Sequence, residues 1–258
     1  MSKEKELGSI RKLLIIMDEL RENCPWDKKQ TFESLSSLTV EETYELIDAI
    51  AEENNNEIKN ELGDLLLHIV FYSKIASETG SFDISDVANS ISSKLIKRHP
   101  HIFKDKKKIS EEDVKKNWEK LKLSEGRKSV LSGVPNSLPP LLKAIRIQKK
   151  VSNIGFDWKQ LEDVRKKVLE ELDELLIELK SGDNERIDEE FGDLLFSLIN
   201  FSRHIGIDAN SSLEKSNKKF IKRFKLLEKI INEKNRSFDN LSNNELNKLW
   251  VYVKKINS

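Results

Sequence analysis

Apolar residues recur at three- and four-residue steps along much of the chain. The clearest stretches are 62–73 and 191–202, where leucine, isoleucine, valine and phenylalanine follow this spacing. Such a period places the apolar side chains on one face of an α-helix. An alternating strand pattern beside an Asn-Gly or Asp-Gly hairpin turn is found nowhere in the sequence. The pattern predicts an all-α fold in which both stretches are helices with a buried face.

The two stretches belong to a longer internal repeat. ELGDLLLHIVFYSK at 61–74 matches EFGDLLFSLINFSR at 190–203, and VEETYELIDAI at 40–50 matches LEELDELLIEL at 169–179, all at an offset of 129 residues. Self-similarity at a nearly fixed offset indicates a duplicated structural unit. We therefore expect two tandem helical domains. Their predicted bounds are 1–123 and 141–258, with a Pro- and Ser-containing linker at 124–140.

Both copies keep acidic residues at the same spacing. Residues three and four apart share a helix face, and the segment 52–60 is long enough to fold the next helix back so that both sets of acids line one groove. Crowded carboxylates must take up protons or bind a cation. Oxygen-only ligands favour Mg²⁺ or Mn²⁺ over zinc. The candidate ligands are Glu41, Glu42, Glu45, Glu61 and Asp64 in the first copy and Glu170, Glu171, Glu174, Glu190 and Asp193 in the second.

A single EExxE on a charged helix is usually a solvated face. The unchanged spacing in two copies favours a metal site over that interpretation. His68 lies four residues after Asp64, but the aligned residue of the second copy is Ser197. We therefore expect His68 to be a core residue rather than a ligand.

Several segments resemble the MazG family of nucleoside triphosphate pyrophosphohydrolases. EETYE with ELGD, and EELDE with EFGD, are similar to its EExxE and ExxD motifs. The resemblance covers nearly the whole chain and includes the tandem form. It also includes CPWDKKQT at 24–31, KRHPHIF at 97–103, VPNSLPPLLKAIRIQKK at 134–150 and GFDW at 155–158.

The resemblance implies an all-α fold, dimerisation through helical bundles and Mg²⁺-dependent cleavage of nucleoside triphosphates to the monophosphate and pyrophosphate. It also implies a role in cleaning the nucleotide pool, with hydrolysis in the C-terminal domain. On this basis Glu171 and Glu190 are candidate catalytic residues as well as ligands. Glu190 is either a ligand or the group that orients the attacking water, and the sequence leaves the two roles open.

The two copies differ in their basic residues. The second copy has Arg165, Lys166, Lys167 and Arg186 beside its acids, where the first has Ser36, Ser37, Leu38 and Glu57. A triphosphate needs positive charge wherever metal does not cover it. The second copy is therefore the better triphosphate site, with Lys167 and Arg186 as further catalytic candidates. The candidate substrate-binding residues are Lys166, Lys167, Arg186, Asn200, Asn217, Lys218, Lys219, Arg223 and Trp250.

Two of these assignments compete with simpler explanations. Lysines and arginines at helical spacing are most often solvated, although NKKFIKRF at 217–224 resembles the phosphate-contacting segment of the family. Trp250 either stacks on a nucleobase or packs in the core. A non-catalytic metal-stabilised scaffold and a nucleotide-binding regulatory protein remain alternatives. A carboxylate-bridged iron protein normally needs Glu-x-x-His, which neither copy contains.

The amino-acid composition limits which binding partners and which cellular compartment we expect for the protein. Lys and Arg total 45, as do Asp and Glu, so no global field favours nucleic acid or an anionic membrane. Nucleic acid is an unlikely partner even for the basic patch at 94–108, which has few aromatic residues. Cys24 is the only cysteine, and no apolar segment resembles a signal peptide or a membrane span. These features predict a soluble cytoplasmic protein.

Overall fold

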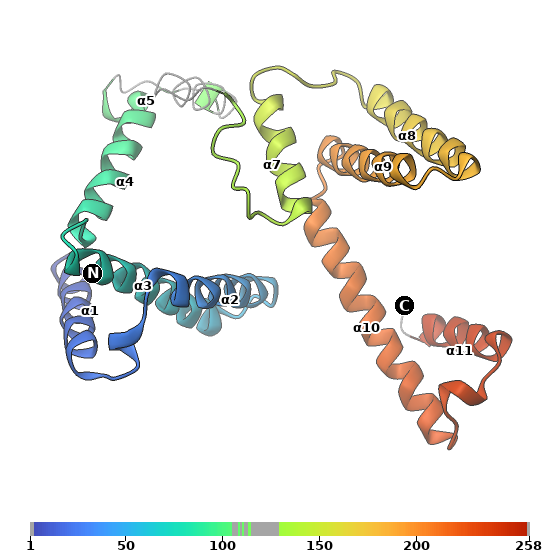
Figure 1. The fold of residues 1–258 in the computed structure, drawn as a ribbon, viewed down its shortest axis with the longest axis horizontal. Helices are drawn as coiled ribbons and strands as arrows, with labels where there is room; N and C mark the ends of the chain where they lie inside the picture. Colours follow the sequence, from blue (N-terminus) through green and yellow to red (C-terminus); the bar gives the residue numbers. More distant parts are fainter. Residues whose placement is uncertain (1–2, 105–107, 109, 111–112, 115–128, 257–258) are drawn as a thin grey trace. The chain divides into compact units, whose positions relative to one another are not determined.

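The computed structural model describes residues 3–104, 108, 110, 113–114 and 129–256, and all its regular structure in these residues is helical (Figure 1). This confirms the predicted all-α fold. The helices are α1 Lys3–Asn23, η1 Asp27–Lys29, α2 Phe32–Ala51, α3 Asn55–Glu78, α4 Ile84–Arg98, α5 Pro100–Phe103, α7 Pro140–Ser152, α8 Leu161–Ser181, α9 Asn184–His204, α10 Ala209–Glu233, η2 Phe238–Asn240 and α11 Asn243–Ile256.

The chain divides into two compact units, which we call unit 1 (Met1–Lys108) and unit 2 (Ile109–Ser258). Each unit contains one of the two repeats. The predicted linker at 124–140 includes residues 124–128, which lie outside the described part of the chain. The domain bounds expected from the sequence remain a prediction. Among the described residues, no helix is both long enough and apolar enough to cross a bilayer.

A helical hairpin forms the centre of each unit, α2–α3 in unit 1 and α8–α9 in unit 2. The α8–α9 turn consists of Gly182 and Asp183. Gly182 ends α8 with φ of 76°, a left-handed conformation that favours glycine, and the Asp183 side chain accepts hydrogen bonds from the amides of Glu185 and Arg186.

The turn in unit 1 is shorter than the segment 52–60 that the sequence suggested. The Asn54 side chain caps the amides of Asn56 and Glu57, so α3 already begins at Asn55. Capping supplies partners for the free amides at the helix start. The short turn therefore still folds α3 back against α2.

The core of unit 1 is built around Met17, Leu35, Val70 and Phe71, each at most 2% exposed. His68 is also buried, as expected, and its Nδ1 lies 3.1 Å from Thr39 Oγ1. Burial lowers the pKa of His68. In unit 2 a separate apolar cluster joins α10 to α11 through Leu227, Ile231, Leu241 and Val253.

The helices at 62–73 and 191–202, which the sequence predicted to have a buried face, are buried along part of that face. Val70 and Ile199 are buried, but Leu62, Phe191 and Leu195 are each about half exposed. A hairpin of two helices buries only the stripe of side chains at their contact. The neighbouring apolar rows therefore remain on the surface of the chain.

Candidate functional site

Three carboxylates meet across the α8–α9 hairpin. Glu171 and Glu174 lie three residues apart on α8, and Glu190 lies on α9; one oxygen of each falls within 4.8 Å of the others. Glu42, Glu45 and Glu61 form the same group in unit 1. We call these groups the unit 2 triad and the unit 1 triad. Three of the five acids suggested by the sequence thus come together in each copy.

The other two acids of unit 2 have different surroundings. Asp193 lies on α9, close enough for its charge to raise the pKa of Glu190, and with Glu171 it lines a hollow of about 170 Å³. Glu170 faces Lys167 instead, and its Oε1 lies 2.6 Å from the Lys167 Nζ. Asp193 therefore extends the triad, whereas Glu170 is held by a lysine.

Desolvation and the crowding of the carboxylates raise the pKa of one or more members of each triad. The pKa of Glu190 is raised by desolvation and by the charges of Glu174, Glu171 and Asp193. In unit 1, desolvation and neighbouring carboxylates likewise raise the pKa of Glu42 and of Glu61. A bound cation relieves this repulsion, and a set of carboxylate oxygens suits a hard divalent ion. The residues of both triads therefore fit Mg²⁺ or Mn²⁺.

Lys167 is the positively charged candidate that directly contacts the unit 2 triad. Its Nζ lies 2.8 Å from Glu171 Oε1, and the Glu171 side chain is only 8% exposed. Hydrogen bonds to Glu170 and Glu171 raise the pKa of Lys167. The ammonium group is thus firmly charged at the edge of the carboxylate cluster, where an anionic ligand would approach.

The other basic candidates of the hairpin lie on its surface. Arg186 is about two-thirds exposed and lies 3.7 Å from both Glu178 Oε1 and Asp183 Oδ2. Lys166 is equally exposed and lies 4.0 Å from Asp163. These side chains share helices with the triad, and their described ion pairs are with acids outside it.

A larger hollow of about 510 Å³ lies beside the triad. Trp158, Phe196 and Asn200 line both this hollow and the smaller one that contains Glu171 and Asp193. The two hollows therefore share a wall, which places an aromatic surface next to the carboxylates. The larger hollow is lined by residues of three segments. They are Ile147, Gln148 and Val151 of α7, Gly155, Phe156, Asp157 and Trp158 of the following loop, and Phe196, Asn200 and Arg203 of α9.

Most of these wall residues were missed in the sequence. Asn200 was a substrate-binding candidate, but no role was assigned to Gln148, Asp157, Trp158 or Arg203. The available signal was the GFDW segment at 155–158, which is one of the segments that resemble the family.

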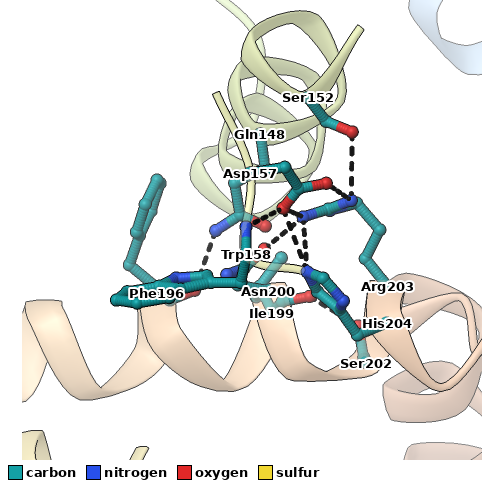
Figure 2. A network of polar contacts seen from close by, with 10 residues as sticks. All are labelled: Gln148, Ser152, Asp157, Trp158, Phe196, Ile199, Asn200, Ser202, Arg203 and His204. Atoms are coloured by element: carbon teal, nitrogen blue, oxygen red, sulfur yellow. Dashed lines mark hydrogen bonds and ion pairs between the residues drawn. The ribbon is translucent and has the colours of Figure 1, made fainter. Parts of the chain in front are cut away.

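A network of polar contacts ties this loop to α9 (Figure 2). Arg203 donates from Nη1 to Asp157 Oδ2 at 2.8 Å and from Nη2 to Asp157 Oδ1 at 2.5 Å, and His204 Nε2 lies 3.0 Å from the same Oδ1. Burial alone would raise the pKa of Asp157, but the hydrogen bonds from Arg203, Ser152 and His204 hold it well below its usual range. Asp157 is thus ionised at neutral pH.

The candidates on α10 and α11 form a separate group. Lys218 Nζ lies 4.0 Å from Glu214 Oε1, and Asn217 donates to Glu214 at 3.5 Å. The ring of Trp250 lies 5.3 Å from that of Phe220 and packs, partly buried, against the α10–α11 cluster. Its stacking on a nucleobase stays a prediction. Lys219 and Arg223 lie on the same helix, α10.

The chain is similar in sequence to a known protein family and to several of its characterised members. The MazG nucleotide pyrophosphohydrolase domain matches residues 30–103 and again 159–227. The nucleoside triphosphate pyrophosphohydrolase of Escherichia coli (strain K12) is 41% identical over 96% of this chain and 98% of its own length. A protein of Thermotoga maritima described as nucleoside triphosphate pyrophosphohydrolase/pyrophosphatase MazG is 44% identical over 97% and 98%.

A solved structure of a mazG-related protein from Thermotoga maritima is 26% identical, with a TM-score of 0.40 over 44% of this chain and 98% of its own. The two domain matches each span one helical hairpin with its triad, so the duplication seen in the sequence is a duplication of one domain type. The chain belongs to the MazG nucleotide pyrophosphohydrolase family.

Proposed function

We propose that unit 2 hydrolyses nucleoside triphosphates to nucleoside monophosphate and pyrophosphate, with Mg²⁺ as its cofactor and Mn²⁺ as a substitute. The observation that carries this proposal is the union of three features on one hairpin: a carboxylate triad, the ammonium of Lys167 and an aromatic hollow beside both. The names of the two relatives that match nearly the whole chain support the same reaction.

Glu171, Glu174, Glu190 and Asp193 would hold the metal, which supplies positive charge to phosphate oxygens when it is bound. Lys167 lies close enough to compensate charge that develops during cleavage. Arg186, Lys166 and the α10 residues Asn217, Lys218, Lys219 and Arg223 are proposed to contact the phosphates further out. Glu170 is proposed to hold Lys167 in place.

In the proposed reaction, water attacks the α-phosphorus and the bond to the bridging oxygen of the β-phosphate breaks. The water gives its oxygen to the monophosphate and pyrophosphate leaves with the bridging oxygen. Glu190, whose pKa is raised, is proposed either as a ligand or as the group that orients the water and takes its proton.

The nucleoside would occupy the larger hollow. Trp158 and Phe196 offer aromatic faces on which a base stacks, and stacking tolerates many bases. A hollow of about 510 Å³ is within the usual size of small-ligand pockets. A broad substrate range of this kind suits an enzyme that removes unwanted nucleotides from the cellular pool.

A homodimer is part of this proposal. Both helices of the hairpin keep exposed leucines: Leu172 and Leu176 on α8 and Leu195 and Leu198 on α9 are each 39–47% exposed. Large exposed apolar surface is usually covered by a partner. A second copy of the chain is the proposed partner, as isologous interfaces are the commonest way to cover such a face.

The test is to incubate the chain with each ribo- and deoxyribonucleoside triphosphate and Mg²⁺ in water enriched in oxygen-18. We expect monophosphate and pyrophosphate, with the label in the monophosphate, and no turnover in the presence of a chelator until Mg²⁺ or Mn²⁺ is restored. Diphosphate with orthophosphate would contradict the proposed bond cleavage. Metal-dependent melting without any product would favour the scaffold alternative.

A further inference from the structure

The aromatic wall of the large hollow has little packing to hold it. The Phe156 side chain is 77% exposed and Trp158 is 48% exposed, and both lie in the loop between α7 and α8. A loop with so few apolar contacts is ordinarily mobile. Something other than burial must therefore fix the position of Trp158.

Asp157 supplies that attachment. Its Oδ1 accepts a hydrogen bond from the backbone amide of Trp158 at 2.9 Å, and both of its oxygens accept from the guanidinium of Arg203 on α9. Arg203 Nη2 also donates to Asn200 Oδ1 at 2.7 Å, and Nη1 donates to Ser152 Oγ at 3.3 Å. Figure 2 shows the Arg203 guanidinium between the Asp157 carboxylate and the side chains of Asn200 and Ser152.

The pair is well suited to set a geometry. Both side chains are largely buried, at 26% and 22% exposed, and the contact is bidentate, which fixes direction as well as distance. Arg203 lies on the same helix as Glu190, Asp193 and Phe196. The ion pair therefore ties the aromatic wall to the helix that also presents the carboxylates.

We propose that Asp157 and Arg203 are positioning residues that hold Trp158 over the hollow and so set the fit of the nucleoside, without touching the phosphates or the metal. This inference rests on the proposed function. It assigns the pair a role in nucleoside binding, whereas Lys167 and the triad act at the triphosphate.

Unit 1 contains a matched control at the aligned position. Lys74 lies 129 residues before Arg203 and also forms an ion pair, but its Nζ lies 2.6 Å from Asp18 on α1. The corresponding loop of unit 1 is held differently, by Arg21 donating to the backbone oxygens of Asp27 and Gln30. Lys74→Ala thus removes an aligned ion pair that does not reach an aromatic wall.

The experiment compares Arg203→Ala, Arg203→Lys, Asp157→Asn and Lys74→Ala by steady-state kinetics with a nucleoside triphosphate. The second measurement is inhibition by inorganic tripolyphosphate with Mg²⁺, a probe that has the phosphates but no nucleoside. We expect Arg203→Ala to raise KM about tenfold with kcat changed less than about threefold, as for a loss of ground-state binding. Arg203→Lys should recover part of the loss, and Lys74→Ala should leave KM unchanged.

The tripolyphosphate Ki should stay within about twofold of the original in every variant, because distant, independent sites are nearly additive. A parallel rise of this Ki would show that the pair supports the whole site and would overturn the proposal. Failure of the unmodified chain to release pyrophosphate would instead reject the proposed function. If Arg203→Ala does not fold by circular dichroism, Arg203→Lys and Asp157→Asn decide the same question, since they keep most of the side-chain volume.

A double-mutant cycle tests whether Arg203 acts through Trp158. Trp158→Ala alone should raise KM as Arg203→Ala does, and the double variant should be little worse than either, because each change removes the same contact. If the rise in KM of the double variant equals the product of the two single rises, Arg203 and Trp158 act independently. That result would overturn the assignment of Arg203 as a positioning residue for Trp158.

Discussion

The two units place the same carboxylates on the same hairpin and differ in what surrounds them. Lys167, Phe196 and Asn200 of unit 2 line the hollows beside the triad. The residues 129 positions earlier are Leu38, Leu67 and Phe71. Phe71 belongs to the buried core of unit 1, and the two leucines pack against that core. A core in one copy thus stands where the other has a pocket.

Under the proposed function, in which unit 2 is the hydrolytic site, a triad alone does not define a nucleotide site. In unit 1 the aligned side chains contribute to the apolar core, and full burial of a large one such as Phe71 stabilises the fold by about 1.5–3 kcal/mol. In unit 2 the aligned residues line two hollows instead: Phe196 and Asn200 line both, and Lys167 lines the smaller one. We therefore propose that the unit 1 triad holds a structural cation rather than a triphosphate.

The largest effect on activity is expected from replacing one candidate metal ligand of unit 2, with the aligned replacement in unit 1 as its control. Glu174→Gln removes a carboxylate from the triad that faces Lys167 and the hollow, and we expect pyrophosphate release to fall on the order of a hundredfold or more, as for loss of a principal electrostatic group. The aligned Glu45→Gln should leave most of the activity. Rates are measured on variants shown to be folded by circular dichroism.

Asp193 and Asp64 lie beside the two triads, so the same comparison of the two units can be repeated with Asp193→Ala and Asp64→Ala. Equal losses of activity from folded variants of both units would show that both are working sites. The contrast drawn from Leu38 and Phe71 would then be wrong.

A smaller effect is expected from filling the pocket of unit 2 in the way unit 1 fills its own. Asn200→Phe introduces the residue that unit 1 has at the aligned position, and the ring should occupy part of the large hollow. We expect KM for nucleoside triphosphates to rise by about tenfold or more, a loss of about 1.4 kcal/mol of binding. Asn200→Ala is the control, since it removes the hydrogen bond from Arg203 but leaves the space open. An unchanged KM for Asn200→Phe would place the nucleoside elsewhere.

The smallest effect is expected on stability, where the triads should respond in opposite directions. Desolvation and then the neighbouring carboxylates raise the pKa of Glu42, so its charge destabilises folded unit 1 at neutral pH. Glu42→Gln should raise Tm by a few degrees at pH 7 and low Mg²⁺. Glu171→Gln should lower it, because Lys167 then loses a buried partner.

The sign of the pH dependence follows from the raised pKa. Glu42 takes up a proton in the folded state before it does so in the unfolded state, so its penalty disappears as the pH falls through its folded pKa. The gain from Glu42→Gln should therefore shrink towards pH 4. Thermal melts at several pH values check this, and a gain that persists in acid would contradict the electrostatic origin.

Much of the architecture could be predicted because it is local or repeated. The three-residue spacing of Glu171 and Glu174 puts them on one helix face whatever else the chain does, and Gly182 with Asp183 dictates a turn. The duplication then showed which acids keep their spacing. Burial was predicted less well, since a hairpin covers a single stripe and left Leu195 exposed.

The sequence by itself determined the helices, the duplication and the pairing of acids across each hairpin, because these depend on helical periodicity and on turns of a few residues. Only the tertiary structure decided that Asp157 meets Arg203, 46 residues away, and that Asn200 opens on a hollow while Phe71 is buried. The physical reason is that such contacts arise from how α7 and its loop pack on α9. That packing depends on the shapes of side chains from several segments, and no period in one segment encodes it.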